Sequence, residues 1–220
     1  MGGIKSLPFI STMKRHNIVK YSKESLELIE LCEEDQRELK MLSKAYYDQV
    51  AKDKFSELSK NYQINSVKRT KQALRILDKI KEPTLVNIGE EASIALVVLV
   101  LHAKLVDMKI VMRAFKDSRD AIAVSVIPVL EDKILVFEGL EQKFGTQWME
   151  GEDGRPFLYP VKDFNKINEL RAKYNLGPIA RPKIVSLKED GSKLRAVTKE
   201  DQRMPTSKEL KLFKGEFNYE

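Results

Sequence analysis

A small set of polar side chains interrupts apolar helical stripes or occupies a glycine-containing turn, and these residue types could carry out acid–base chemistry. The imidazole of His102 can take up and release a proton near neutral pH, so it is the candidate general acid or base. The carboxylate of Asp132 or of Asp35 could orient the other ring nitrogen of this histidine. We expect the set to converge in one partly buried polar pocket. Its members are Asp35, His102, Asp132, Gln142, Thr146, Gln147 and Arg171.

The remaining members of the set suit ligand binding. Arg171 and the amide groups of Thr146 and Gln147 could bind an anionic or carbonyl oxygen. Asp35 and Gln142 are further candidates for contacts to a polar ligand. The alternative is a structural network in which each side chain satisfies another and pins the helices to the C-terminal region.

Asp35 falls on the apolar stripe of the first expected helix, next to Gln36. A buried carboxylate is costly without an ion-pair or hydrogen-bond partner. Asp35 therefore either has such a partner or lies at the edge of the stripe in water.

The stretch 130–147 positions most of this set. Apolar residues recur at three- and four-residue steps from Leu130 to Phe137, which predicts a helix. The stretch ends in Phe144-Gly145-Thr146-Gln147, where the glycine can adopt a positive φ that other residues avoid. A helix that runs into such a turn can hold several polar side chains beside an apolar core.

Apolar periodicity elsewhere predicts a mainly α-helical, single-domain bundle. Helix 90–106 is apolar on nearly every side and is expected at the centre of the bundle, with His102 near its end. In helix 121–140, Pro128 either kinks the helix or begins a new one after Ser125. The expected helices span residues 22–50, 66–81, 90–106, 108–115, 121–140 and 163–174.

The segments between these helices have mixed patterns. Residues 53–65 are expected to form a connector, and residues 85–89 a short extended passage. Residues 148–159 contain two glycines among charged residues, which predicts a short hairpin or loop after the turn.

Composition divides the chain into three parts. A length of 220 residues with 42% hydrophobic residues suits one folded domain, which we place at residues 22–179. Residues 1–21 form a basic N-terminal arm. Residues 180–220 are charged and poor in large apolar residues, which predicts an irregular, flexible tail or an arm that orders on a partner. One short helix is expected in this extension, at residues 207–213.

Charge and motifs argue against several function classes. The net charge is +6 and the pI is about 9.2, but basic and acidic residues are mixed along the chain. Because zinc spacings and basic-aromatic motifs are also absent from the sequence, a nucleic-acid partner is not favoured. No glycine-rich phosphate loop and no G-x-S-x-G element occurs. With only two histidines in the sequence, no metal site and no cofactor is predicted.

The N-terminus and the single cysteine bear on location. Residues 1–6 fit the pattern M-G-x-x-x-[ST], in which Gly2 would accept a myristoyl chain, with basic residues between positions 14 and 20 as a second signal. The lone Cys32 cannot form an internal disulfide and suits a reducing cytoplasm. The apolar run 92–106 is shorter than the roughly 20 residues of a membrane-spanning helix. We expect a cytoplasmic protein, with contact to a membrane surface through the N-terminus as an option.

Several short sequence pieces stand in a consistent order between residues 31 and 179. They are Glu33-Glu34-Asp35-Gln36, Gly89-Glu90, His102-Ala103, Leu130-Glu131-Asp132-Lys133, Glu138-Gly139, Gln142, Gly145-Thr146-Gln147, Pro160-Val161-Lys162-Asp163, Glu169-Leu170-Arg171 and Leu176-Gly177. In this combination the chain resembles a family of bacterial proteins of unknown function that share a helical body and a C-terminal Y/F-G-T-Q signature, here Phe144 to Gln147.

The chain departs from that family pattern at three positions. Lys133 stands where arginine is usual, Thr70 where asparagine is common, and no tryptophan precedes Pro83. The resemblance implies a helical fold and a set of polar positions, and it implies no activity.

Two function classes follow from the sequence. The first is a small hydrolase or transferase that acts on a polar metabolite or modified group in a pocket around His102, Asp132, Gln147 and Arg171. The second is a non-enzymatic binding or regulatory protein that docks a protein partner or an anionic membrane surface through its basic termini.

Overall fold

Most of the chain is described by the computed structural model, namely residues 19–48, 50–117, 126–151, 156–179 and 199–213. The elements in these residues are nearly all helices, which confirms the mainly α-helical prediction. The chain forms two compact units that meet in the sequence between Val126 and Ile127. Sequence analysis expected one core domain at residues 22–179. The boundary between the two units falls inside this range, since the first four helices pack on one another, while the later elements have a core of their own.

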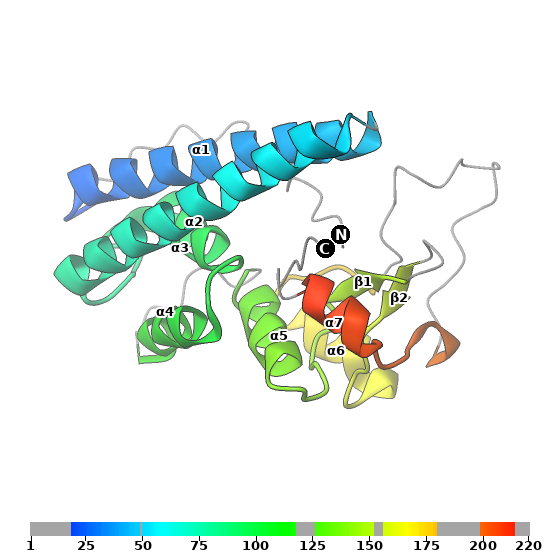
Figure 1. Ribbon diagram of the computed structural model, residues 1–220. Helices are drawn as coiled ribbons and strands as arrows, with labels where there is room; N and C mark the ends of the chain where they lie inside the picture. Colours follow the sequence, from blue (N-terminus) through cyan, green and yellow to red (C-terminus); the bar gives the residue numbers. More distant parts are fainter. Residues whose placement is uncertain (1–18, 49, 118–125, 152–155, 180–198, 214–220) are drawn as a thin grey trace. The chain divides into compact units, whose positions relative to one another are not determined.

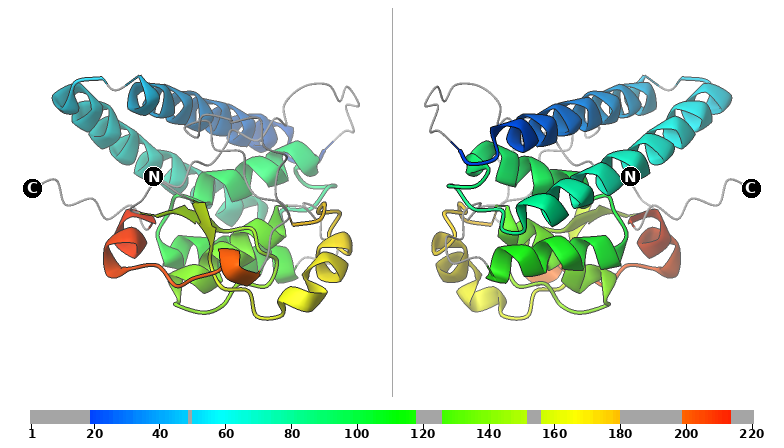
Figure 2. Two further views of the ribbon diagram at one scale, coloured as in Figure 1. Left: turned by 90° about the vertical axis from the view of Figure 1, so that its right-hand side faces the viewer. Right: turned by 90° about the vertical axis from the view of Figure 1, so that its left-hand side faces the viewer.

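The N-terminal unit is built on two long helices. Helices α1 (Ser22–Tyr47) and α2 (Lys52–Ile80) follow one another through a short connection and lie side by side along their length (Figures 1 and 2). Helix α3 (Gly89–Val100) packs against both, and α4 (Leu105–Asp117) packs against α2 and α3. From Ala92 onwards α3 buries all but one of its side chains, so it is the buried helix that its composition predicts.

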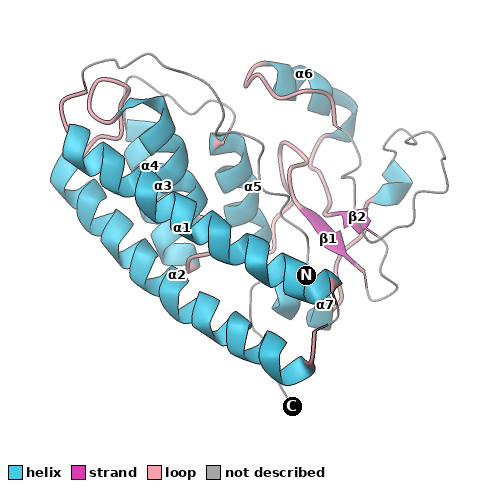
Figure 3. Ribbon diagram, turned by 90° about the horizontal axis from the view of Figure 1, so that it is seen from above, coloured by secondary structure: helices cyan, strands magenta, loops and turns pink. Residues whose placement is uncertain are grey.

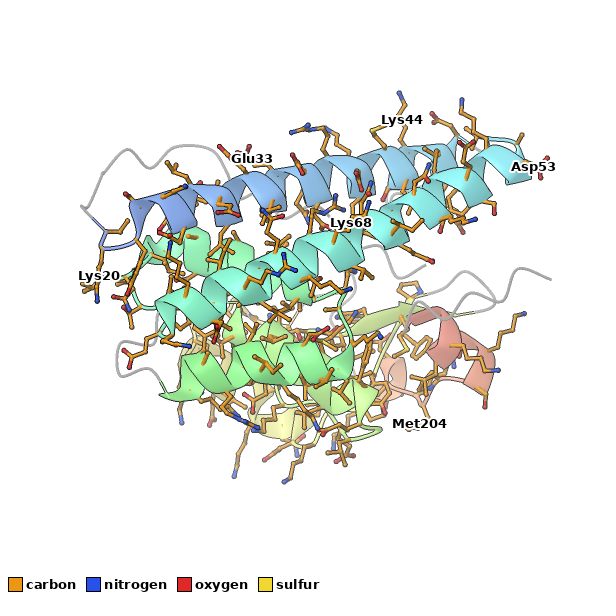
Figure 4. The ribbon with its side chains drawn as sticks, turned by 60° about the vertical axis from the view of Figure 1, so that its left-hand side comes forward. Lys20, Glu33, Lys44, Asp53, Lys68 and Met204 are labelled. Carbon is orange, nitrogen blue, oxygen red and sulfur yellow. The ribbon has the colours of Figure 1, made fainter. Side chains whose placement is uncertain are left out.

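The long helices are amphipathic. Helix α1 buries Leu28 and Cys32, and burial raises the pKa of the Cys32 thiol to about 12, so this cysteine is a core residue. The charged side chains of Glu33, Lys44 and Lys68 are exposed on α1 and α2 (Figure 4). This division between an apolar and a charged face is what drives the two helices to pack together.

The prediction of a connector at residues 53–65 was wrong, because these residues belong to α2. Half-buried Phe55, Leu58 and Tyr62 continue the buried stripe of the helix toward its N-terminus. Small or charged residues on the same stripe, such as buried Ser59 and Arg69, break the apolar pattern in the sequence. The segment is therefore helical, although its buried face is not apolar throughout and so does not give the periodicity from which a helix is predicted.

Two further predictions differ from the structure in the segments around α3. Residues 85–88 form a turn and not an extended passage, and the backbone N–H groups of Asn87 and Ile88 donate to the Thr84 carbonyl at 3.1 and 2.9 Å. The central helix ends at Val100 and not at residue 106, and residues 101–104 form a turn before α4 begins. His102 therefore lies in a turn.

The C-terminal unit combines short helices with a hairpin. Helix α5 (Ile127–Phe137) has Pro128 in its first turn, where a proline costs no hydrogen bond, so this proline begins a helix. Strands β1 (Trp148–Glu150) and β2 (Pro156–Leu158) pair antiparallel, so of the predicted hairpin or loop the structure has the hairpin (Figure 3). The 3₁₀ helix η1 (Phe164–Lys166) leads directly into α6 (Ile167–Ala172).

The hairpin separates two apolar clusters, because successive side chains of a strand point to opposite faces. The first cluster comprises Val136, Met149, Phe157 and Tyr159. The second comprises Leu158, Val161 and Ile167, with Trp148, Phe164 and Ile179 packed around them. The small sheet is therefore covered on both sides by the unit's own residues.

Part of the C-terminal extension packs on this hairpin. The 3₁₀ helix η2 (Lys199–Asp201) and helix α7 (Ser207–Phe213) lie in the C-terminal unit, and Leu210 of α7 packs against the first cluster. The short helix at 207–213 is confirmed. Residues 199–213 contact the hairpin of their own chain. The rest of the predicted flexible tail or partner-ordered arm, residues 180–198 and 214–220, lies outside the described residues. Among the helices of the described ranges, none combines the length and apolarity that a membrane crossing requires.

The continuity of α2 through residues 53–65 is testable with a proline at Asn61, an exposed position in the middle of the helix. Proline removes a helical hydrogen bond and clashes with the preceding turn, so Asn61→Pro should lower the free energy of unfolding by about 3 kcal/mol. Asn61→Ala is the control and should be neutral or stabilising. Urea unfolding followed by circular dichroism measures both, and equal midpoints for the two variants would show that the segment is not helical.

Candidate functional site

The carboxylate of Asp132 is the centre of the polar cluster in the C-terminal unit. Asp132 projects from α5 and is fully buried. Its Oδ1 accepts a hydrogen bond from the Lys143 N–H at 2.7 Å, and both oxygens lie 3.1 Å from the Phe144 nitrogen. Its Oδ2 accepts from the backbone N–H and the hydroxyl of Thr146, at 3.0 and 2.9 Å. One side chain thus holds the whole turn from residue 143 to residue 146.

These contacts decide what Asp132 can do. Burial raises the pKa of the Asp132 carboxyl, and the hydrogen bonds from Thr146, Lys143 and Phe144 act against that rise. A carboxylate has about four lone-pair positions, and the turn uses them with donors that cannot leave without the turn unfolding. This geometry is that of a structural anchor.

The two glutamines of the cluster are bonded to the same turn. Fully buried Gln142 donates through Nε2 to the carbonyls of Gln147 and Tyr159, at 3.2 and 2.6 Å, and its Oε1 accepts from the Gln147 N–H at 2.9 Å. The Gln147 side chain donates to the Val129 carbonyl at 3.2 Å and to the Thr146 hydroxyl at 2.9 Å. Both amide groups therefore join the turn to the start of the hairpin and to α5.

Arg171 closes the cluster from α6. Its Nη1 donates to the Phe144 carbonyl at 2.6 Å, and its Nε donates to the Gly177 carbonyl at 2.7 Å. Burial lowers the pKa of the Arg171 guanidinium, and the charge of Asp132 acts against that change. The ring of Tyr174 packs edge-on against Phe144 with 4.9 Å between ring centroids. Arg171 thus ties the signature turn to the chain that follows α6.

Five of the seven predicted residues therefore come together as one network, namely Asp132, Gln142, Thr146, Gln147 and Arg171. Asp35 and His102 belong to the N-terminal unit. Gly2 lies outside the described residues. A shallow groove on the molecule is lined by Lys71, Leu74, Arg75 and Asp78, none of which is in the predicted set.

Asp35 has an ion-pair partner, as one of the two alternatives from the sequence requires for a buried carboxylate. The side chain is 1% exposed and accepts a hydrogen bond from Arg69 of α2 at 3.1 Å. Arg69 also donates to Glu38 at 2.9 Å, and Asn65 donates to the same carboxylate at 2.9 Å. Burial raises the pKa of the Asp35 carboxyl, and Arg69 acts against that rise. This buried ion pair joins α1 to α2.

Sequence reasoning missed Arg69, although a signal for it exists. Arg69 stands four residues before buried Ala73 and three after buried Ser66, so it occupies the packed face of α2. An arginine at such a position needs an acid on the facing helix. The two residues of the pair are 34 apart in the sequence, and periodicity alone does not identify the partner.

His102 has an aromatic neighbour within the N-terminal unit. Its imidazole meets the ring of Tyr62 edge-on with 6.2 Å between ring centroids, and the Arg69 guanidinium lies 5.8 Å from the same ring. His102 is half-buried in the turn at residues 101–104. It packs beside the ion pair of α1 and α2 as part of that unit.

Lys133, which the sequence marks only as a departure from a family pattern, is also buried. Its exposed fraction is 6%, and its Nζ lies 5.4 Å from the centroid of the Phe137 ring. Desolvation lowers the pKa of the Lys133 amine to about 8. This amine is next to Asp132 in the sequence and was not among the predicted site residues.

Comparisons with protein-family models, with curated proteins and with solved structures give no match for this chain. The contacts of the residues themselves are therefore the basis for a functional proposal.

The signature turn is testable at Gly145, which has a φ of +65°. A Cβ there would lie 2.6 Å from Ile179 Cδ1 and 2.7 Å from Ile167 Cδ1. Gly139 is the matched control, because its φ is +75° and a Cβ would meet nothing within 4 Å. Gly139→Ala should cost about 1 kcal/mol from backbone strain alone. Gly145→Ala should cost about 1–3 kcal/mol more, because overpacking against Ile167 and Ile179 adds to a similar backbone strain.

Chemical denaturation of the two alanine variants beside the parent protein measures these costs. Equal losses at the two glycines would contradict the packing of Ile167 and Ile179 around the turn.

Proposed function

We propose that this protein is a non-enzymatic binding or regulatory protein in which the Phe144–Gln147 signature has a structural role. The observation that carries this proposal is the hydrogen bonding of Asp132. Its carboxylate accepts from the backbone N–H groups of Lys143 and Phe144 and from the backbone N–H and hydroxyl of Thr146. A general acid or base needs a position at which it can exchange a proton with a substrate. An anchor of this kind supports a scaffold role better than a hydrolase or transferase role.

The partner that the charge distribution favours is an anionic membrane surface. Residues 1–21 contain four basic residues, namely Lys5, Lys14, Arg15 and Lys20, and no acidic residue. Residues 22–179 contain 25 basic and 26 acidic residues, so the excess positive charge belongs to the termini. Each basic residue near an anionic bilayer contributes about 1 kcal/mol of attraction. Apolar side chains between these charges, such as Phe9 and Ile10, suit insertion at the interface.

Location in the cytoplasm agrees with this proposal. The buried, free Cys32 suits a reducing compartment, and the cytoplasmic leaflet carries the anionic lipid that a basic arm would contact. Acylation at Gly2 stays a prediction of the sequence, and the binding experiment below does not depend on it.

Vesicle sedimentation tests the membrane proposal. The full chain should sediment with phosphatidylcholine vesicles that contain phosphatidylserine, and not with pure phosphatidylcholine. Lys14→Glu with Arg15→Glu should weaken binding at least about ten-fold, because two attractive charges become repulsive. Lys40→Glu with Lys44→Glu is the control, since both lysines are exposed on α1 and the change in net charge is the same.

A similar loss in both double variants would mean that only the net charge of the molecule matters. That result, or equal binding to the two kinds of vesicle, would contradict a membrane contact through the N-terminal arm.

A further inference from the structure

We propose that the hairpin of the C-terminal unit presents a peptide-docking face, and that residues 199–213 are a displaceable ligand which occupies this face within the same chain. The docking face comprises the edge of β2 and the first apolar cluster, which contains Val136, Met149, Phe157 and Tyr159. A protein partner that uses this face must present a similar peptide and displace residues 199–213. The proposal is independent of the membrane contact, which concerns the other end of the chain.

Backbone pairing forms one half of the docking contact. Gln202 pairs with Leu158 in the parallel sense, and the Arg203 N–H donates to the Leu158 carbonyl at 3.2 Å. The Gln202 side chain accepts from the Val161 N–H at 2.8 Å. Addition of an extended segment to the edge of a sheet is a common way in which proteins bind peptides. Without this segment, the Val161 N–H and the Leu158 carbonyl would lose these partners.

Side-chain contacts to the apolar cluster form the other half. The guanidinium of Arg203 stacks on the ring of Phe157, with 3.7 Å from its central carbon to the ring centroid. Leu210 of α7 packs against the cluster itself. The stacked Arg203 and the half-buried Leu210 give the face a preference for one cationic and one apolar anchor, seven residues apart.

The segment carries its own folding signals, as a ligand must. Thr206 and Glu209 form a reciprocal cap at the start of α7, in which the Thr206 N–H donates to the Glu209 carboxylate at 2.8 Å and the Glu209 N–H donates to the Thr206 hydroxyl at 3.2 Å. The same carboxylate accepts two hydrogen bonds from Arg203, at 2.8 and 2.6 Å. These contacts hold the cationic and apolar anchors in one arrangement.

The docking contact is small compared with a permanent core. Met204 is 59% exposed, and only Asp201 and Glu209 are buried among the side chains described in this segment. A helix as short as α7 is marginal in water without packing. Elements with few buried apolar contacts open at low free energy, which is the property that a displaceable segment needs.

A labelled peptide with the sequence of residues 199–213 tests the proposal. Its binding is measured by fluorescence anisotropy to the full chain and to the full chain with Arg203→Ala and Leu210→Asp. The wild-type face is occupied at a high effective concentration by its own tethered segment. The double variant vacates the face, so the peptide should bind it at least ten-fold more tightly than it binds the wild-type chain. A peptide that carries the same two changes should bind neither chain.

Two results would overturn the proposal. In the first, circular dichroism shows that the double variant is folded, and the variant binds neither peptide or binds both peptides with equal affinity. The second comes from amide hydrogen exchange of the wild-type chain, which decides the matter if the double variant does not fold. The Arg203 and Val161 amides should exchange together and faster than the Tyr159 amide, which is bonded to the Gln147 carbonyl at the open end of the hairpin and does not contact residues 199–213 through this bond. Exchange of all three only through global unfolding would make residues 199–213 an integral part of the core.

Discussion

The C-terminal unit depends on one buried charge. An ionised carboxylate in an apolar interior costs several kcal/mol, and Asp132 offsets this cost with the N–H groups of Lys143, Phe144 and Thr146 and with a hydroxyl. Donors in this arrangement exist only when the chain turns sharply. The positive φ of Gly145 lets it turn, and the side chains of Ile167 and Ile179 fill the space that a Cβ would need. The signature sequence is thus explained by packing and hydrogen bonding.

The turn at residues 143–146 also fixes the position of the hairpin and of the surface that the hairpin presents. Gln142 bonds to the backbone at Gln147, just before β1, and at Tyr159, just after β2, and so sets where β1 begins relative to the end of β2. With the strands in place, one face of the sheet carries the apolar cluster on which residues 199–213 lie. The polar network therefore supports the face of the hairpin on which residues 199–213 lie.

Helical periodicity predicted much of this fold and little of its polar contacts. The apolar run in α3 identified that helix, because its buried positions carry mostly apolar side chains. The short pattern of α7 was enough to predict the helix at 207–213. The N-terminal half of α2 was missed because polar Ser59 lies on its buried face. The sequence also placed Asp132 near Thr146, but the partners of that carboxylate are mostly backbone N–H groups, which every residue possesses. Such contacts depend on chain path, and residue types do not reveal them.

Amide hydrogen exchange in an Asp132→Asn variant tests the central claim most directly. An asparagine has one acceptor oxygen, and its NH2 group faces backbone donors, so the amides of Lys143, Phe144 and Thr146 should lose protection well beyond the change in global stability. Glu131→Gln removes a neighbouring, more exposed acid that pairs with the Lys143 ammonium group, and it should leave those three amides protected. Unchanged protection of the three amides in Asp132→Asn would contradict the account.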